Sequence, residues 1–121
     1  MIPHNKPTLG LEEEEAAIRV IRSGWVAKGE EVKSFENEFC NFVGLPKGHA
    51  VAVSNGTAAL YLALLALDGS GKKIASPGYV CCALRHAVTM SEGENVLIDT
   101  EYDSPNIDLK TLYNKNPQIA I

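Results

Sequence analysis

The sequence has few cysteines. Only three occur among 121 residues, and two of them, Cys81 and Cys82, are adjacent. Adjacent cysteines have neither the spacing of a small disulfide framework nor that of a zinc site. The three histidines, His4, His49 and His86, also lack metal-ligand spacing. We therefore predict reduced thiols and no metal site.

The chain also lacks a long apolar run and an excess of basic residues. Its longest apolar run covers residues 58–67, about half of the roughly 20 residues that a membrane-spanning helix needs. The formal net charge of −4 offers no basic surface for nucleic acid or for an anionic membrane. The first seven residues lack the apolar core of a signal peptide, so we expect a cytoplasmic location.

Two helices are predicted in the first part of the chain. Residues 11–23 carry glutamates near their start and are followed by Gly24, a typical helix stop. The four glutamates at 12–15 fan around this helix and cannot converge on one metal ion. A second helix is predicted over residues 32–43, and we expect its apolar and aromatic stripe to be core. The stripe consists of Val32, Phe35, Phe39, Phe42 and Val43.

From His49 onward, short apolar strands alternate with helices. The predicted strands are residues 49–54, 72–76, 95–99 and 118–121, and the predicted helices are residues 57–67, 79–90 and 108–114. Strands separated by helices indicate parallel pairing with right-handed crossovers, and thus an α/β fold with an open sheet. Parallel sheets are normally covered on both faces. We expect residues 1–48 to form an N-terminal arm with two helices. Because the sheet needs further cover, we expect residues 49–121 to be the first part of an α/β domain, truncated at its C-terminal end.

The junction before the helix at residues 57–67 is suited to an anion. Ser54, Asn55, Gly56 and Thr57 form a polar turn between an apolar strand and an Ala/Leu-rich helix. The first backbone N–H groups of a helix are unpaired and lie at the positive end of its dipole, which favours a phosphate. Alternatively, Ser54 or Asn55 only caps the helix and Gly56 only makes the turn.

Ligands of open α/β sheets bind beyond the carboxyl ends of the strands. Two further loops are expected there, and each contains a candidate residue. Tyr79 either stacks on a ligand ring or caps the sheet. Cys81 and Cys82 are reactive thiols or, as we favour, buried packing residues. Asp99 is a site carboxylate or a loop cap.

The sequence gives less support to a dinucleotide site, a P-loop site or a Schiff-base lysine. Gly56 alone does not make the three-glycine dinucleotide fingerprint, and no Gly-Lys-Ser/Thr follows it as in a P-loop. Lys72 and Lys73 are possible Schiff-base amines, but lysines that open a strand are normally solvated. Trp25 lies in a loop that ends at Gly29, and it either packs over the core or faces a ligand.

The order of these motifs resembles the N-terminal part of the DegT/DnrJ/EryC1/StrS family, the pyridoxal-phosphate-dependent sugar aminotransferases. The most specific piece is Asn55 to Leu60, because its distances from the Gly-Trp loop and from the Pro-containing loop also fit. The other matching pieces are residues 22–25 with Gly29, residues 35–36 with Phe39, residues 52–54, residues 76–79, and residues 97–99 with 106–108. The resemblance implies a partial open parallel-sheet, three-layer domain like the large domain of type I PLP-dependent aminotransferases.

The resemblance also implies a cofactor site. Gly56 and Thr57 would bind the phosphate of pyridoxal phosphate, and the loop after Pro77 would lie against its pyridine ring. The stacking aromatic residue usual in the family falls on Cys81, which is a departure. Tyr79 would then supply the ring, or a thiol would cover that face.

Two residues of the first part are implicated by the same resemblance. Trp25 and Gly29 would lie in a loop near the substrate or the partner subunit. The Schiff-base lysine of the family and the aspartate that holds the pyridine nitrogen belong to a later part of the sequence. We therefore assign no catalytic residue and expect the isolated chain to be inactive.

The function implied for the full enzyme is transfer of an amino group, from glutamate, to a keto sugar attached to a nucleotide. A homo-oligomer such as a dimer, or a partner chain, would cover the open sheet. One alternative is a non-catalytic binding or assembly module that docks a separately encoded partner. Another is an unrelated α/β domain that binds a phosphate ligand.

Overall fold

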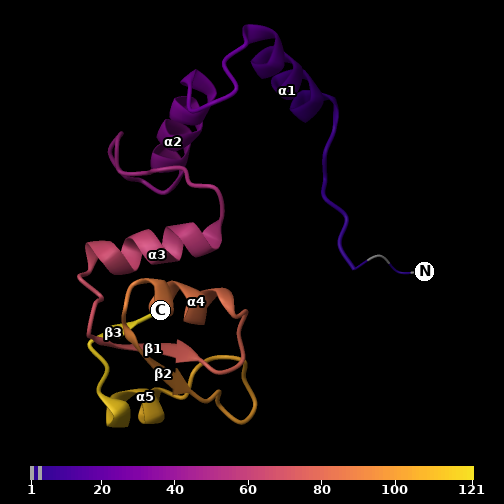
Figure 1. Ribbon diagram of the computed structural model, residues 1–121. Helices are drawn as coiled ribbons and strands as arrows, with labels where there is room; N and C mark the ends of the chain where they lie inside the picture. The colour runs from indigo at the N-terminus through magenta and orange to yellow at the C-terminus, as the bar shows by residue number, and fades with distance from the viewer. Residues whose placement is uncertain (1, 3) are drawn as a thin grey trace. The chain divides into compact units, whose positions relative to one another are not determined.

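The computed structural model describes residue 2 and residues 4–121 (Figure 1). The chain divides into two compact units between Ala52 and Val53, which we describe separately. The expected division into an arm at residues 1–48 and an α/β domain at residues 49–121 stays a prediction. None of the helices in the described residues has the length and apolar character that crossing a bilayer requires.

The first unit begins with helix α1 (Leu11–Ser23). The N–H of Gly10, just before the helix, donates to Oε2 of Glu13 at 2.7 Å. The helix ends at Gly24, whose φ of 71° is a left-handed conformation that glycine adopts without strain. The N–H of Gly24 donates to the carbonyl of Ile21 at 3.1 Å. The predicted helix over residues 11–23 is confirmed.

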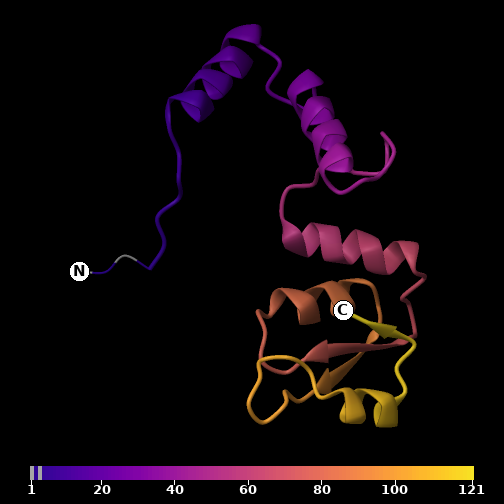
Figure 2. The ribbon, with the colours of Figure 1, turned by 180° about the vertical axis from the view of Figure 1, so that it is seen from behind.

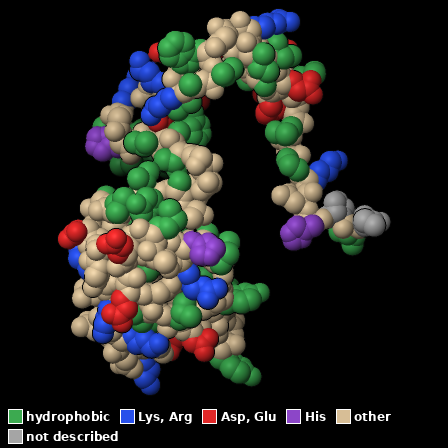
Figure 3. Space-filling model, in the orientation of Figure 1, with side chains coloured by type: hydrophobic (Ala, Val, Ile, Leu, Met, Phe, Trp, Pro, Cys, Tyr) green, Lys and Arg blue, Asp and Glu red, His purple; other side chains and the backbone are tan. Residues whose placement is uncertain are grey.

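The second helix, α2 (Glu30–Phe42), presents its aromatic stripe to solvent. Phe35, Phe39 and Phe42 are 59%, 47% and 87% exposed, and Cys40 is the one buried residue of the helix. Figure 3, in the orientation of Figure 1, shows hydrophobic side chains at the surface where this helix lies. The expectation that the stripe is core is therefore wrong. A helical stripe is buried only where another element packs on it, and α1 does not cover this one.

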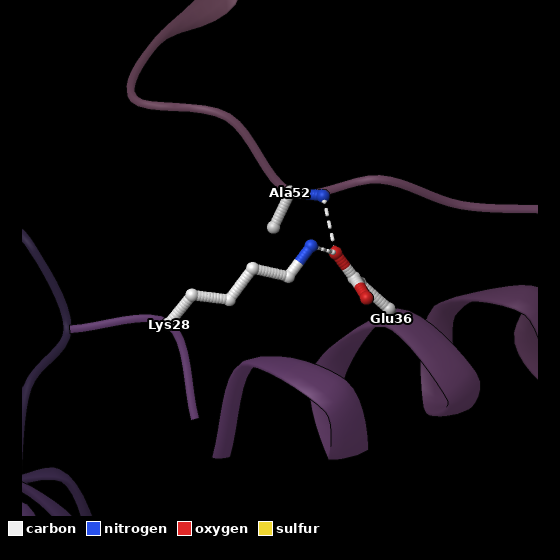
Figure 4. A network of polar contacts seen from close by, with 3 residues as sticks. All are labelled: Lys28, Glu36 and Ala52. Atoms are coloured by element: carbon white, nitrogen blue, oxygen red, sulfur yellow. Dashed lines mark hydrogen bonds and ion pairs between the residues drawn. The ribbon is translucent and has the colours of Figure 1, made fainter. Parts of the chain in front are cut away.

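A carboxylate joins three parts of the first unit. Oε1 of Glu36 accepts a hydrogen bond from Nζ of Lys28 at 3.0 Å and another from the backbone N–H of Ala52 at 2.9 Å (Figure 4). The side chain of Glu36 is only 16% exposed. The hydrogen bond from Ala52, and then that from Lys28, lowers the pKa of Glu36. Glu36 thereby ties the loop before α2 to the segment after it.

The predicted strand over residues 49–54 is not formed. Val51 is exposed, and the N–H of Ala52 donates to Glu36 rather than to a strand. A strand forms only when a neighbour accepts and donates its backbone hydrogen bonds. The segment has no such neighbour among the described residues, and both edges of the central strand β1 are already occupied.

The second unit is an α/β sandwich. Its elements are α3 (Gly56–Ala66), β1 (Lys73–Pro77), α4 (Ala83–Met90), β2 (Glu94–Ile98), α5 (Leu109–Lys115) and β3 (Ile119–Ala120). The strands are parallel, in the order β2-β1-β3. Figures 1 and 2 show α3 and α4 on one face of the sheet and α5 on the other. The predicted α/β fold with an open, three-layer parallel sheet is confirmed.

The core of the second unit lies between β1 and the two helices on its face. Its buried cluster consists of Leu64, Ile74, Ala87 and Val88, with Leu60, Tyr61, Ile119 and Ile121 packed against it. Burial of one large aliphatic side chain contributes about 1.5–3 kcal/mol. Helix α3 is apolar all round, so its outer residues Leu62 and Leu65 remain about half exposed. The core fixes α3 and α4 over the sheet and thereby positions their first turns.

Candidate functional site

The candidate site lies at the carboxyl edge of the sheet. A short turn joins the end of α3 to the start of β1, so the helix runs antiparallel to the strand and begins near the strand's carboxyl end. Helix α4 follows β1 and also begins at this edge. Figures 1 and 2 show both helix N-termini on the side to which β1 points. This is the edge where open α/β sheets bind ligands.

The first turn of α3 has two free backbone donors. Asn55 caps the helix, because its Oδ1 accepts the N–H of Ala58 at 2.9 Å, and its carbonyl accepts the N–H of Ala59 at 3.2 Å. The N–H groups of Gly56 and Thr57 have no acceptor in the part of the chain that the structure describes. The capping interpretation is therefore correct for Asn55, and it still leaves two donors for an anion.

Open space lies next to these donors. A Cβ added to Gly56 would meet no atom within 4 Å, and Gly56 is exposed. Neither a left-handed backbone nor crowding within the chain therefore requires glycine at this position. Thr57, a partly buried residue, adds a hydroxyl. Two N–H groups, a hydroxyl and free space at a helix N-terminus fit the phosphate of pyridoxal phosphate.

The loop after β1 presents an aromatic ring and two thiols to solvent. Tyr79 is 80% exposed, so it does not cap the sheet. Cys81 and Cys82 are also exposed, so the expectation that they are buried is wrong. The reason is that α4 begins at Ala83 rather than at residue 79. Residues 79–82 therefore precede the helix instead of lying on its buried face.

Backbone contacts hold the loops at the ends of β1 and β2. The N–H of Gly78 donates to the carbonyl of Ile98 at 2.7 Å. Oδ1 of Asp99 accepts the N–H of the next residue, Thr100, at 2.9 Å. This contact supports the loop-capping interpretation of Asp99. The site interpretation stays a prediction.

A second carboxylate of the same region caps α5. Asp108 accepts the N–H groups of Lys110 and Thr111 at 3.1 and 3.2 Å, and also the hydroxyl of Thr111. The hydrogen bond from the hydroxyl is the largest of several causes that lower the pKa of Asp108. Asp108 therefore has a structural role as the N-cap residue of α5.

Lys72 and Lys73 lie at the opposite edge of the sheet, at the amino end of β1. Nζ of Lys72 donates to the carbonyl of Leu67 at 2.8 Å and lies 3.8 Å from Oδ2 of Asp68. Lys72 thus satisfies the C-terminal end of α3, where a cation is favourable. Lys73 is exposed at the amino end of β1. Neither amine lies at the carboxyl edge with Gly56 and Thr57.

Trp25 and Gly29 belong to the first unit, where they contact each other. Nε1 of Trp25 donates to the carbonyl of Lys28 at 3.0 Å. A Cβ at Gly29 would lie 2.4 Å from Cδ1 of Trp25, so the ring occupies the space that a side chain there would need. The indole is nevertheless 66% exposed, so it does not pack over a core. Both residues line a hollow of about 1110 Å³ that also includes Lys28, Lys33 and Arg19.

The structure thus places the predicted site residues in two groups. Gly56, Thr57, Tyr79 and Cys81 belong to loops and helix ends at one edge of the second unit, while Trp25 and Gly29 lie in the first unit. Sequence reasoning missed Glu36 as an anchor. Its partner Ala52 is 16 residues away, and no local pattern signals such a contact.

Solved aminotransferases have the same fold. The chain is 26% identical to a sugar aminotransferase, Spr1654, from Streptococcus pneumoniae, solved in apo, PLP and PMP forms, with a TM-score of 0.89 over 98% of this chain. It is 27% identical to the aminotransferase TlmJ from Streptoalloteichus hindustanus, with a TM-score of 0.87 over 99% of this chain. An aminotransferase from Psychrobacter cryohalolentis is 28% identical, with a TM-score of 0.79 over 93% of this chain.

These relatives are much longer. The chain covers 30% of Spr1654, 33% of TlmJ and 29% of the Psychrobacter enzyme. The family model of the DegT/DnrJ/EryC1/StrS aminotransferases matches residues 7–115, which is most of the 121-residue sequence. The chain therefore belongs to the DegT/DnrJ/EryC1/StrS aminotransferase family.

Proposed function

We propose that the chain is the N-terminal part of a pyridoxal-phosphate-dependent aminotransferase. Its substrate would be a keto sugar attached to a nucleotide, and glutamate would be the amino donor. The observation that carries the proposal is the first turn of α3, where Gly56 and Thr57 offer two free N–H groups beside open space. Membership of an aminotransferase family supports the same reading.

Each residue of the carboxyl edge has a proposed role toward the cofactor. Gly56 and Thr57 bind the phosphate, because the dianion lies at the positive end of α3 and accepts two N–H groups and a hydroxyl. Tyr79 and Cys81 lie against the ring. Pyridoxal phosphate, when bound, supplies the electron sink that amino-group transfer requires.

The loop between α1 and α2 is proposed to contact the substrate. The exposed face of Trp25 can stack on a planar or sugar ring, and Gly29 leaves room for that indole. Lys28 lines the same hollow, and its cationic side chain is suited to a phosphorylated substrate. These assignments concern the first unit by itself.

We propose that these 121 residues do not by themselves complete an active site. Lys72 precedes β1, and Lys73 is its first residue. Both lysines therefore lie at the amino end of this strand, away from Gly56 and Thr57. We further propose that the full enzyme is cytoplasmic and homo-oligomeric.

Binding of pyridoxal phosphate to the chain tests the phosphate site. The substitution Thr57→Val removes the hydroxyl, and a hydrogen bond to a charged group contributes about 1.5–3 kcal/mol. The dissociation constant, measured by cofactor fluorescence, should therefore rise by about 10- to 100-fold. Thr89→Val is the matched control, because Thr89 is exposed on α4 and its hydroxyl donates to the carbonyl of Arg85. Equal affinity of Thr57→Val and wild type would contradict the proposed site.

Borohydride reduction tests the proposed inactivity. After incubation with pyridoxal phosphate, we expect no lysine to be labelled in preference to the others, because Lys72 and Lys73 lie at the amino end of β1 rather than beside the phosphate site. Peptide mass mapping measures the label on each lysine. Stoichiometric, selective labelling of Lys72 or Lys73 would show that the chain has its own reactive amine and would refute this part of the proposal.

The second candidate function is an assembly module that docks a separately encoded partner. The observation that favours it is that each unit has exposed apolar residues, such as Phe39 on α2 in the first unit and Leu65 on α3 in the second. Size-exclusion chromatography with light scattering tests it. A stable, monodisperse monomer of 13.0 kDa would argue against a chain that requires a partner.

A further inference from the structure

Cys81 and Cys82 form a dithiol that the proposed amino-transfer function does not use as a pair. Both side chains are exposed, and neither is in a disulfide. Cys40, the third cysteine, is buried in the other unit and lies outside this pair. Two accessible thiols on consecutive residues can bind the same atom, each through its own sulfur.

The backbone of this pair is held in place by the first turn of α4. The carbonyl of Cys81 accepts the N–H of Leu84 at 3.3 Å, and the carbonyl of Cys82 accepts the N–H of His86 at 3.0 Å. A fixed backbone reduces the conformational entropy that ligand binding must remove. The backbone that bears the two thiols is thus partly ordered before any ligand binds.

Direct bonding between the two sulfurs is disfavoured. Consecutive Cα atoms are about 3.8 Å apart, whereas the Cα atoms of ordinary disulfides lie roughly 4.4–6.8 Å apart. A third atom placed between the sulfurs enlarges the ring and relieves this constraint. Cysteine thiolates are soft ligands, and they prefer to bind soft, thiophilic elements. In residues 2 and 4–121, His, Cys, Asp and Glu side chains form no cluster of three that would complete a tetrahedral metal site.

We propose that Cys81 and Cys82 are a chelating site for trivalent arsenicals. The probe is phenylarsine oxide. In the reaction the two S–H bonds and the arsenic–oxygen bonds break, two arsenic–sulfur bonds form, and the oxygen leaves as one water with both protons. Arsenic stays trivalent, so no oxidant or reductant takes part. Cys81 also belongs to the proposed cofactor site, but the readout is a covalent mass of the chain without cofactor, so the two proposals can fail separately.

Intact mass spectrometry of the full chain tests the proposal. We expect one probe, less one water, per chain. The adduct should resist excess 2-mercaptoethanol and be removed by 1,2-ethanedithiol, because two linked thiols bind with a high effective concentration. Tryptic mapping should place it on residues 74–85, the peptide that contains both cysteines.

Single substitutions separate chelation from simple thiol labelling. Cys81→Ser and Cys82→Ser change exposed side chains, and each should make release by 2-mercaptoethanol about 100-fold faster. Cys40→Ala should keep the resistant adduct, and peptide mapping still decides the location if this buried substitution prevents folding. A resistant adduct in either single serine variant, or equally fast release from wild type, would overturn the proposal.

Discussion

At the scale of single residues, Glu36 organises the first unit. One carboxylate oxygen accepts both the ammonium group of Lys28 and the N–H of Ala52. The N–H of Ala52 lies in an extended segment without strand partners, so this bond satisfies a donor that would otherwise face solvent. The contact therefore holds the end of the first unit against α2.

The substitution Glu36→Ala should release the segment around Ala52. We expect faster amide hydrogen exchange at Ala52, because its acceptor is gone, with little change in the core of the second unit. Exchange measured by NMR at neutral pH tests this prediction. Glu38→Ala is the matched control, because Glu38 is an exposed residue of the same helix. Unchanged protection of Ala52 in Glu36→Ala would contradict the role of the carboxylate.

The Glu36 contact should also depend on pH. The pKa of Glu36 is lower in the folded chain than its ordinary value of 4.5. A group with a lowered folded pKa contributes stability above its unfolded pKa and loses it as the pH falls through the folded value. The exchange protection factor of Ala52 should therefore be constant from neutral pH down to about 5 and fall below 4.5. A decrease between pH 7 and 6 would point to another titrating group.

Gly29 has a separate role at this scale, because its missing side chain makes room for an indole. The substitution Gly29→Ala places a Cβ 2.4 Å from Cδ1 of Trp25, so the ring must move. Trp25 is the single tryptophan, so its fluorescence spectrum reports the movement. In Gly10→Ala, the control, the new Cβ would meet Glu13 at an ordinary 3.6 Å. A spectrum of Gly29→Ala identical to wild type would show that the ring does not depend on this glycine.

At the scale of elements, packing of α3 on the sheet determines where the candidate site forms. Leu64 is fully buried against Ile74 and α4, while its neighbour Leu65 is 47% exposed. Helix α3 is apolar on all sides, so the elements that pack against it determine which of its sides is buried. The first turn of α3 is held at the carboxyl edge as a consequence.

Two leucine substitutions test this packing. Leu64→Ala should lower the free energy of unfolding by about 2–5 kcal/mol, because it removes buried methyl groups and leaves a cavity. Leu65→Ala should cost clearly less, because half of that side chain already faces water. Urea denaturation measures both. Equal losses would indicate that a further surface covers α3 in solution.

Much of the element structure was predictable from local patterns. The helix over residues 11–23 follows from its glutamates and Gly24, and Asn55 caps α3 as its side chain allows. The errors arise where long-range partners decide. Residues 49–54 have the apolar character of a strand but no pairing neighbour among the described residues, and the Phe35 stripe has no element packed on it.

The prediction of the site was similarly divided. The two free N–H groups at Gly56 and Thr57 were predictable, because they depend on a helix start that the sequence marks clearly. The exposure of Cys81 and Cys82 was not, because the hydrogen bond between Gly78 and Ile98 and the later start of α4 are tertiary effects.

At the scale of the whole molecule, the chain spans about a third of the length of its relatives. It belongs to the DegT/DnrJ/EryC1/StrS aminotransferases, and it covers 30% of Spr1654. The exposed outer residues of α3 and the exposed stripe of α2 are consistent with the proposed need for further cover. We propose that this portion supplies the phosphate-binding turn and that another part of the enzyme supplies the reactive amine.

The central claim is that the first turn of α3 binds the cofactor phosphate. The most direct test is titration of isotope-labelled chain with pyridoxal phosphate, and separately with inorganic phosphate, followed by amide NMR. The account predicts that both ligands shift the Gly56 and Thr57 amides most strongly, and that Thr57→Val weakens both effects. Shifts that centre on the start of α4 or on the surface lysines, with Gly56 and Thr57 unchanged, would contradict it.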